Sequence, residues 1–233
     1  MEISKVMHFI LIGFLFIAHG VFAADNVTAL VPDTMAERVK ACTICHGEED
    51  MLGRDAYYPR IGGKPAGYLY NQLRNFRDGR RYYQPMAILL ENMTDAYLWD
   101  IAEHFSSLQF PYPPPEQIIL SSDDVELAER LVYNGDPARD IPACSACHGE
   151  KLMGVEPFIP GLLGLPRAYL TAQMGGWRNG GIMRGKTPDC MSEIAKQLTD
   201  EESNAVTKWL ARQQAFGNPD IASALLPELV HRC

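Results

Sequence analysis

The sequence has no excess of basic residues: 21 lysines and arginines stand against 29 aspartates and glutamates in 233 residues, a formal net charge of −8. A phosphate backbone is bound by a concentrated basic surface, so nucleic acid is excluded as a partner. Runs of alternating apolar and polar residues, which would indicate β-strands, are also absent. Apolar residues instead recur at helical spacing, as in Leu98, Ile101 and Phe105, and Thr199 with Glu202 forms a capping box before the last long helix. We therefore predict an all-α fold.

Only one hydrophobic run, residues 6–23, is long enough to interact with a bilayer. Lys5 precedes this run, and the letters VFA at its end are compatible with cleavage by a signal peptidase. We predict that residues 1–23 are a signal peptide and that the mature chain is exported to the periplasm. The alternative is a retained anchor helix, since a run of this length can just cross a membrane. Membrane association is expected only in that case.

The rest of the chain contains the same motif twice. The letters CTICHG, from Cys42, recur as CSACHG, from Cys144. Further residues follow each motif in the same order: Pro59 and Pro160, Tyr68 and Tyr169, Gln72 and Gln173, Gly79 and Gly180, Met86 and Met191, Thr94 and Thr199. Such self-similarity indicates a tandem duplication.

A proline-rich segment separates the two copies. Residues 109–122 read QFPYPPPEQIILSS, and the prolines prevent a helix and stiffen the chain. We predict two domains, residues 24–108 and 123–213, joined by this linker and followed by a tail, 214–233. Each domain is expected to hold three or four helices.

The repeated C-x-x-C-H motif is the signature of covalent haem attachment. Two thiols on one helical turn reach the two vinyl groups of the porphyrin, and the adjacent histidine faces the iron. The predicted thioether residues are Cys42, Cys45, Cys144 and Cys147, and the predicted iron ligands are His46 and His148. The alternatives are zinc, which needs a fourth ligand in each copy, and a local disulfide, which leaves the repeated histidines without a role.

Histidine is too scarce to supply the second axial ligand of both irons. Besides the signal peptide and the motifs, only His104 and His231 remain, and they do not match each other in the repeat. Met86 and Met191 do match, and each follows its motif histidine with enough chain to pass around a haem. We predict that these two methionines bind the irons.

Two alternatives to these methionines remain open. Met51 and Met153 also match in the repeat, but they lie only five residues after the motif histidines, which leaves little chain for that path. Cys190, next to Met191, would lower the potential of its iron if it bound as a thiolate. Cys190 and Cys233 are also the two cysteines outside the motifs; either they form a disulfide, or Cys233 is free or pairs with another molecule.

The motif, a Pro-x-x-x-Gly loop, Tyr-Leu-x-x-Gln, an aromatic-Arg-x-Gly turn and a methionine before a final helix all occur twice. Together they resemble the dihaem class I cytochromes c of the cytochrome c4 type. The resemblance implies two cytochrome c domains related by pseudo-twofold symmetry, each wrapped around one covalent haem c. It also implies that Pro59 and Pro160 accept hydrogen bonds from the motif histidines. An arginine of a Gly-x-Arg turn would pair with a propionate; Arg81 fits, whereas the second copy reads Gly-Gly-Ile unless Arg184 substitutes.

The resemblance implies a periplasmic carrier that passes single electrons from a respiratory or dehydrogenase donor to a terminal oxidase or another acceptor. Its partners are then redox proteins, and it has no catalytic residues. The alternative class is a dihaem enzyme, such as a thiosulfate dehydrogenase or a peroxidase, or the cytochrome subunit of a flavoprotein or quinoprotein dehydrogenase. The acidic balance favours partners with a basic docking surface, whose association weakens as salt rises.

We expect the mature chain to carry two covalent haems, because the attachment motif is duplicated. Intact-mass spectrometry should give the mature polypeptide plus two haem masses, and both haems should stay with the protein in acidified acetone. A chain that carries one haem, or loses both in that solvent, would contradict the motif assignment.

Overall fold

The computed structural model describes residues 31–47, 57–179 and 189–215. The predicted signal peptide and nearly all of the predicted tail lie outside these residues. All the elements described below belong to one compact unit, Asp33–Cys233. None of the described helices has both the length and the apolar character that crossing a bilayer requires.

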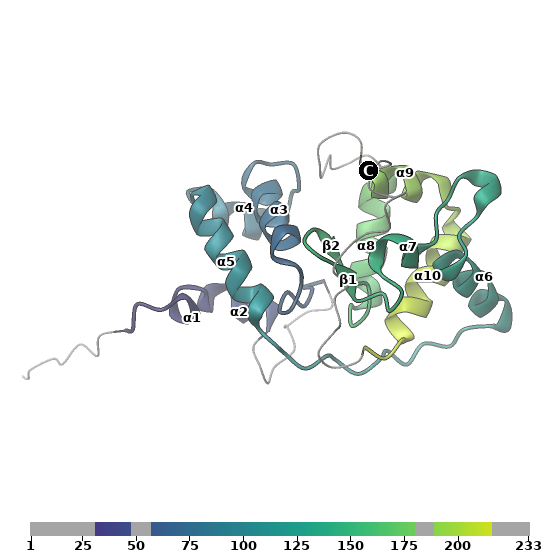
Figure 1. Ribbon diagram of the computed structural model, residues 1–233, viewed down its shortest axis with the longest axis horizontal. Helices are drawn as coiled ribbons and strands as arrows, with labels where there is room; N and C mark the ends of the chain where they lie inside the picture. Colours follow the sequence, from purple (N-terminus) through teal and green to yellow (C-terminus); the bar gives the residue numbers. More distant parts are fainter. Residues whose placement is uncertain (1–30, 48–56, 180–188, 216–233) are drawn as a thin grey trace, which may run out of the picture. The chain divides into compact units, whose positions relative to one another are not determined.

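The described part of the first copy contains five α-helices (Figure 1). They are α1 (Met35–Arg38), α2 (Lys40–His46), α3 (Ala66–Arg77), α4 (Gln84–Leu90) and α5 (Asp95–Ser107). The helix α3 packs against α4 and α5. As the sequence predicts, α5 starts after Thr94, whose hydroxyl accepts from the backbone N–H of Tyr97 at 3.2 Å, and buries Leu98, Ile101 and Phe105.

The described part of the second copy contains five α-helices and one 3₁₀-helix. They are α6 (Ser122–Tyr133), η1 (Pro137–Arg139), α7 (Cys144–His148), α8 (Arg167–Arg178), α9 (Cys190–Gln197) and α10 (Asp200–Arg212). The helix α10 packs against α6 and α8, and its buried face carries Val206, Trp209 and Leu210. These side chains join one apolar core with Leu131 and Leu170.

The expectation of three or four helices per copy is wrong, since the described part of each copy has five α-helices. The sequence does not reveal α1, α2 and α7 because they are too short to show a helical period. The second copy also has two strands, β1 (Gly154–Val155) and β2 (Ile159–Pro160), paired antiparallel. Strands of two residues leave no alternation in a sequence. Gly154 has φ 106°, and a Cβ there would lie 2.7 Å from the carbonyl oxygen of Ile159, so this hairpin requires glycine.

Residues 108–121 contain no helix or strand and contact both copies. The guanidinium of Arg60 donates to the carbonyl oxygen of Phe110 and lies 4.1 Å from the centroid of the Tyr112 ring. Tyr112 in turn packs against the core of the second copy. A Cβ at Gly164 would lie 2.3 Å from this ring, so the ring's place depends on that glycine.

The two copies also touch directly at the start of α3. The backbone N–H of Tyr68 donates to the carbonyl oxygen of Pro157 at 3.1 Å, which satisfies one of the free N–H groups of the first turn. Phe158 lies so close that a Cβ at Gly67 would be 2.5 Å from its ring. Residues 157 and 158 can therefore approach this closely only because Gly67 has no side chain.

The ion pair of Glu202 with Arg139 fixes the start of α10. Glu202 and Thr199 form the predicted capping box, with Thr199 N to Glu202 Oε2 at 2.9 Å and Glu202 N to Thr199 Oγ1 at 3.1 Å. Arg139 Nη1 donates to the same carboxylate at 3.1 Å. These contacts, the Arg139 hydrogen bond first, hold the pKa of Glu202 below its usual value.

We expect Glu202→Gln to lower the free energy of unfolding of the second copy by about 1 to 3 kcal/mol at neutral pH, because charge-assisted hydrogen bonds are lost. A carboxylate with a lowered folded pKa stabilises above its unfolded pKa and loses this effect as pH falls through the folded pKa. The difference from wild type should therefore shrink below about pH 4 in urea titrations. The exposed neighbour Glu201→Gln is the control, and an equal loss there would contradict this role.

Candidate haem sites

The two motif helices present their cysteines and histidines in the same way. In α2 and α7 the two cysteines lie one turn apart, and each helix ends at the histidine because a glycine follows with positive φ: Gly47 at 87° and Gly149 at 84°. None of the four motif cysteines forms a disulfide, which removes the local-disulfide alternative. Burial raises the pKa of Cys42 and Cys144 to about 11, so both are neutral thiols at pH 7.

Each motif histidine is oriented by a proline carbonyl. The Nδ1 atom of His46 lies 2.8 Å from the carbonyl oxygen of Pro59, and that of His148 lies 2.7 Å from that of Pro160. A carbonyl oxygen can only accept, so Nδ1 carries the proton and Nε2 keeps its lone pair. Burial is the main cause that lowers the pKa of both histidines. Both are therefore neutral imidazoles with one nitrogen available to a metal, as the resemblance implies.

A cavity of about 630 Å³ opens beside α2, and we call it cavity 1. Its wall contains Cys42, Cys45, His46 and, from α4, Met86. The remaining wall is largely apolar, with Leu69, Phe76, Leu90, Ile101 and Phe105. A cavity of this size with two thiols, an available imidazole nitrogen and an apolar lining fits a covalently attached porphyrin.

The wall of cavity 1 also includes Tyr169 and Gln173 of the second copy, a contribution that the sequence does not predict. Arg81 is buried, with Nη1 2.7 Å from Gln72 Oε1 and Nη2 3.0 Å from Gln173 Oε1 and 3.3 Å from the Tyr169 hydroxyl. Gln72 and Gln173 match each other in the repeat, and this match is the feature of the sequence that could have indicated them. In the described part of the chain the side-chain acceptors of Arg81 are all neutral, so its charge is available to a propionate. Arg184 lies outside the described residues.

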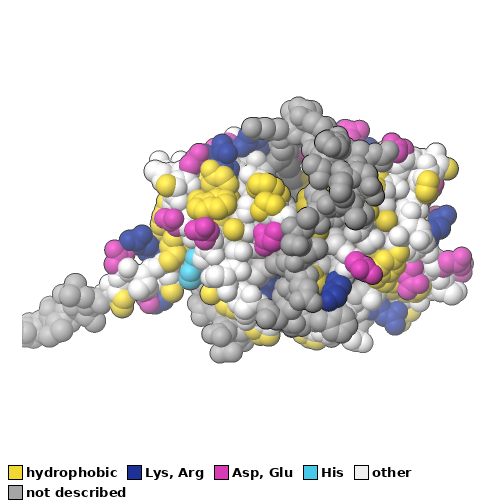
Figure 2. All heavy atoms as spheres, viewed as in Figure 1, with side chains coloured by type: hydrophobic (Ala, Val, Ile, Leu, Met, Phe, Trp, Pro, Cys, Tyr) yellow, Lys and Arg dark blue, Asp and Glu magenta, His cyan; other side chains and the backbone are white. Residues whose placement is uncertain are grey.

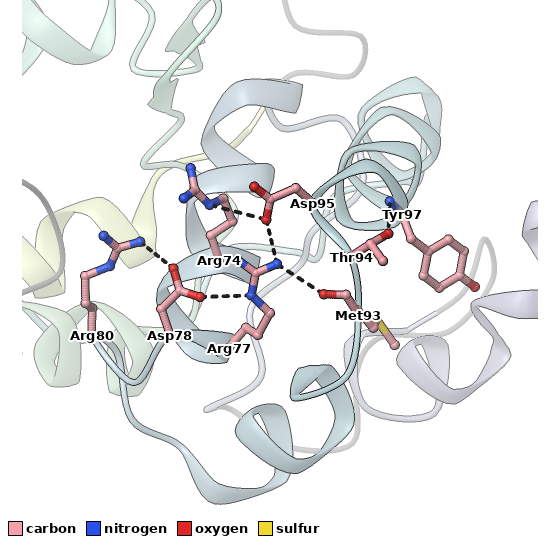
Figure 3. Close-up of polar contacts among 8 residues, drawn as sticks. All are labelled: Arg74, Arg77, Asp78, Arg80, Met93, Thr94, Asp95 and Tyr97. Carbon is pink, nitrogen blue, oxygen red and sulfur yellow. Dashed lines mark hydrogen bonds and ion pairs between the residues drawn. The ribbon is translucent and has the colours of Figure 1, made fainter.

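An ion-pair network at the end of α3 supports the turn that leads to Arg81 (Figure 3). Arg77 donates to Asp78 Oδ1 at 2.9 Å, to Asp95 Oδ1 at 2.6 Å and to the Met93 carbonyl oxygen at 3.1 Å. In the second copy the matched residues, Arg178 and Asp200, form the same pair. The network therefore ties α3 to the start of α5, and the repeat preserves this link in both copies.

Several known proteins are similar to this chain. No family model matches the chain. A thiosulfate dehydrogenase electron acceptor of Thiomonas intermedia is 36% identical over 173 residues, which cover 74% of this chain and 78% of the relative. The chain belongs to the dihaem class I cytochromes c of the cytochrome c4 type. Cytochrome c4 of Pseudomonas aeruginosa is 28% identical over 76% of this chain and 87% of its own length.

Solved structures show the same fold for this cytochrome. Reduced recombinant cytochrome c4 from Pseudomonas stutzeri aligns with a TM-score of 0.64 and 24% identity, over 76% of this chain and 95% of that one. Thiosulfate dehydrogenase from Marichromatium purpuratum aligns with a TM-score of 0.61 and 28% identity, over 73% of this chain and 36% of that one. The cytochrome is therefore a mostly helical electron carrier that binds two covalently attached haem c groups.

The structure places the candidate axial ligands differently in the two copies. Met86 lines cavity 1 together with His46, whereas Met191 lies half-buried in the first turn of α9. Of the competing pair, Met153 is buried in the core of the second copy, and Met51 lies outside the described residues. Cys190 is disulfide-bonded, so no thiolate is available from it; Cys233 and His231 lie outside the described residues.

We expect Met86→Ala and Met191→Ala each to remove about half of the far-red charge-transfer band that methionine sulfur gives on ferric haem. Absorption spectra of the oxidised variants measure this directly. Met153→Leu, which conserves the volume of a buried side chain, is the control and should leave the band unchanged. Loss of the band in that variant would contradict the assignment.

Proposed function

We propose that this cytochrome is exported to the periplasm, where it accepts single electrons from a thiosulfate dehydrogenase and passes them to a further redox protein. The observation that carries this proposal is the greater identity to proteins of that role. The thiosulfate dehydrogenase electron acceptors of Thiomonas intermedia and Stutzerimonas stutzeri are 36% and 33% identical to the chain, against 28% for cytochrome c4 of Pseudomonas aeruginosa.

The proposed ligand sets follow the repeat. Cys42 and Cys45 would hold the first haem and Cys144 and Cys147 the second, with His46 and Met86 on the first iron and His148 and Met191 on the second. The haem supplies the one-electron chemistry of its iron. The chain's own residues would bind each iron through a neutral imidazole nitrogen and a soft methionine thioether, and this pairing favours a relatively high reduction potential.

The wall of cavity 1 also favours a high reduction potential. Its apolar side chains exclude water and lower the local dielectric, which disfavours the additional positive charge of ferric iron. Arg81 offers a buried positive charge with neutral acceptors only, in the described residues, and so stabilises carboxylates placed beside it. None of these residues needs to transfer a proton, which suits a carrier rather than an enzyme.

Exposed tyrosines mark the part of cavity 1 that a partner protein can reach. Tyr57, Tyr82 and Tyr83 are 62%, 68% and 42% exposed and line the cavity, and Leu89 lies beside them. Figure 2 shows hydrophobic side chains gathered over the region of α3, α4 and α5, with acidic side chains nearby. Apolar contact surrounded by acidic groups fits a partner with a basic rim around its own redox centre.

Export and the domain boundaries are part of the same proposal. Residues 1–23 would be removed, leaving domains 24–108 and 123–213 with the linker 109–122 between them and the tail 214–233 after them. The disulfide at Cys190 supports an oxidising compartment, because disulfides persist there and are rare in a reducing cytosol.

We expect a purified thiosulfate dehydrogenase plus thiosulfate to reduce both haems of this cytochrome in stopped-flow experiments, more slowly as ionic strength rises. Thiosulfate without the dehydrogenase is the control and should reduce neither haem. If the isolated cytochrome itself oxidises thiosulfate with ferricyanide as the acceptor, the enzyme alternative is correct instead. If the dehydrogenase fails to reduce it, another donor must take that place.

A further inference from the structure

Lys64, a residue of the first copy, reaches the loop that orients the motif histidine of the second copy. It lies between Gly63 and the N-cap residue of α3, Pro65. Its Nζ atom lies 3.4 Å from the carbonyl oxygen of Gly161. Gly161 directly follows Pro160, whose carbonyl oxygen accepts from His148 Nδ1 at 2.7 Å. The ammonium group therefore lies beside the second haem site, although the first copy supplies it.

The same side chain belongs to the wall of cavity 1, so it lies between the two haem sites. In the described part of the chain, Lys64 has no carboxylate partner. After burial, the positive charge of Arg60 also lowers the pKa of Lys64. The contact with Gly161 and the place in the wall of cavity 1 thus put one positive charge beside both haem sites.

The repeat shows that this arrangement is not symmetric. By alignment of Pro65 with Pro166, the match of Lys64 in the second copy is Leu165, which is buried in the apolar core. The other cation in the wall of cavity 1, the buried Arg81, also belongs to the first copy. In the second copy the position matched to Arg81 is Ile182, which lies outside the described residues. Among the described residues, both cations that line cavity 1 therefore belong to the first copy.

We propose that Lys64 controls the reduction potential of one haem. Its positive charge, supplied by the first copy, raises the reduction potential of the haem bound by the second copy. Reduction adds one negative charge to the haem, and a cation in a medium of low dielectric stabilises that charge. The same cation also makes the imidazole of His148 a weaker electron donor to ferric iron. The inference rests on the two-haem ligand sets of the proposed function, and it assigns the potential of one haem to a residue of the other domain.

The test compares three variants of the holoprotein in a spectroelectrochemical titration. Lys64→Met removes the charge at similar length, Lys64→Gln removes it but keeps an N–H donor for Gly161, and Lys64→Arg keeps the charge. Because burial lowers the pKa of Lys64 to about 7, the titration is made at pH 6, where the ammonium is protonated. Lys196→Met, which removes a half-exposed lysine of the second copy, is the control.

We expect Lys64→Met and Lys64→Gln to lower the electron affinity of the second haem about tenfold, which is about 59 mV for a one-electron couple. Lys64→Arg and Lys196→Met should keep the wild-type waves. The wave of the second haem is identified as the one that Met191→His moves, since exchange of the methionine ligand lowers the potential.

Three results would overturn the proposal. The first is an unchanged titration in Lys64→Met, and the second is a shift confined to the wave that Met191→His leaves in place. The third is a wild-type titration in Lys64→Gln alongside a shifted Lys64→Met, because hydrogen bonding rather than charge would then be responsible. A wild-type protein that titrates with one haem only would instead contradict the ligand sets of the proposed function.

Discussion

The hydrogen bond from each motif histidine to a proline carbonyl oxygen is the constraint on which both haem sites depend. It decides which ring nitrogen carries the proton, and it leaves the other nitrogen with its lone pair available to a metal. The helices α2 and α7 are too short to fix a side chain by their own packing, and both end at the histidine itself. The loops that contain Pro59 and Pro160 therefore orient the ligands from outside the helices.

The second property of the structure is that the two copies depend on each other. Cavity 1 includes Tyr169 and Gln173 of the second copy, and the acceptors of Arg81 come from both copies. In the described part of the chain, the first copy supplies Arg81 and Lys64, the two cations in the wall of cavity 1. A duplicated sequence has thus produced two sites with different electrostatic surroundings, which is a physical basis for unequal potentials.

The sequence predicts those features that depend on neighbours along the chain. Thr94 and Thr199 start their helices as expected, and the capping box of Glu202 is present, because caps need only residues within one turn. The place of Met86 in cavity 1 agrees with the repeat match. The cross-copy contacts of Arg81 and Lys64 could not be predicted, because an internal alignment compares one copy with the other and contains no information on how they pack. The short helices and the β1–β2 hairpin were missed because they are shorter than any period that a sequence can display.

The close approach at Gly67 has a consequence for how such a protein can change. The first copy contributes a glycine, and the second contributes the backbone of Pro157 and the ring of Phe158 that fill the space a side chain would need. The residue matched to Gly67 in the second copy is Ala168, whose methyl group could not occupy that place. The halves are consequently no longer interchangeable: a chain built from two second halves would bring a Cβ into the contact. The shape of each half now limits which substitutions the other half can accept, as in the two different subunits of a heterodimer.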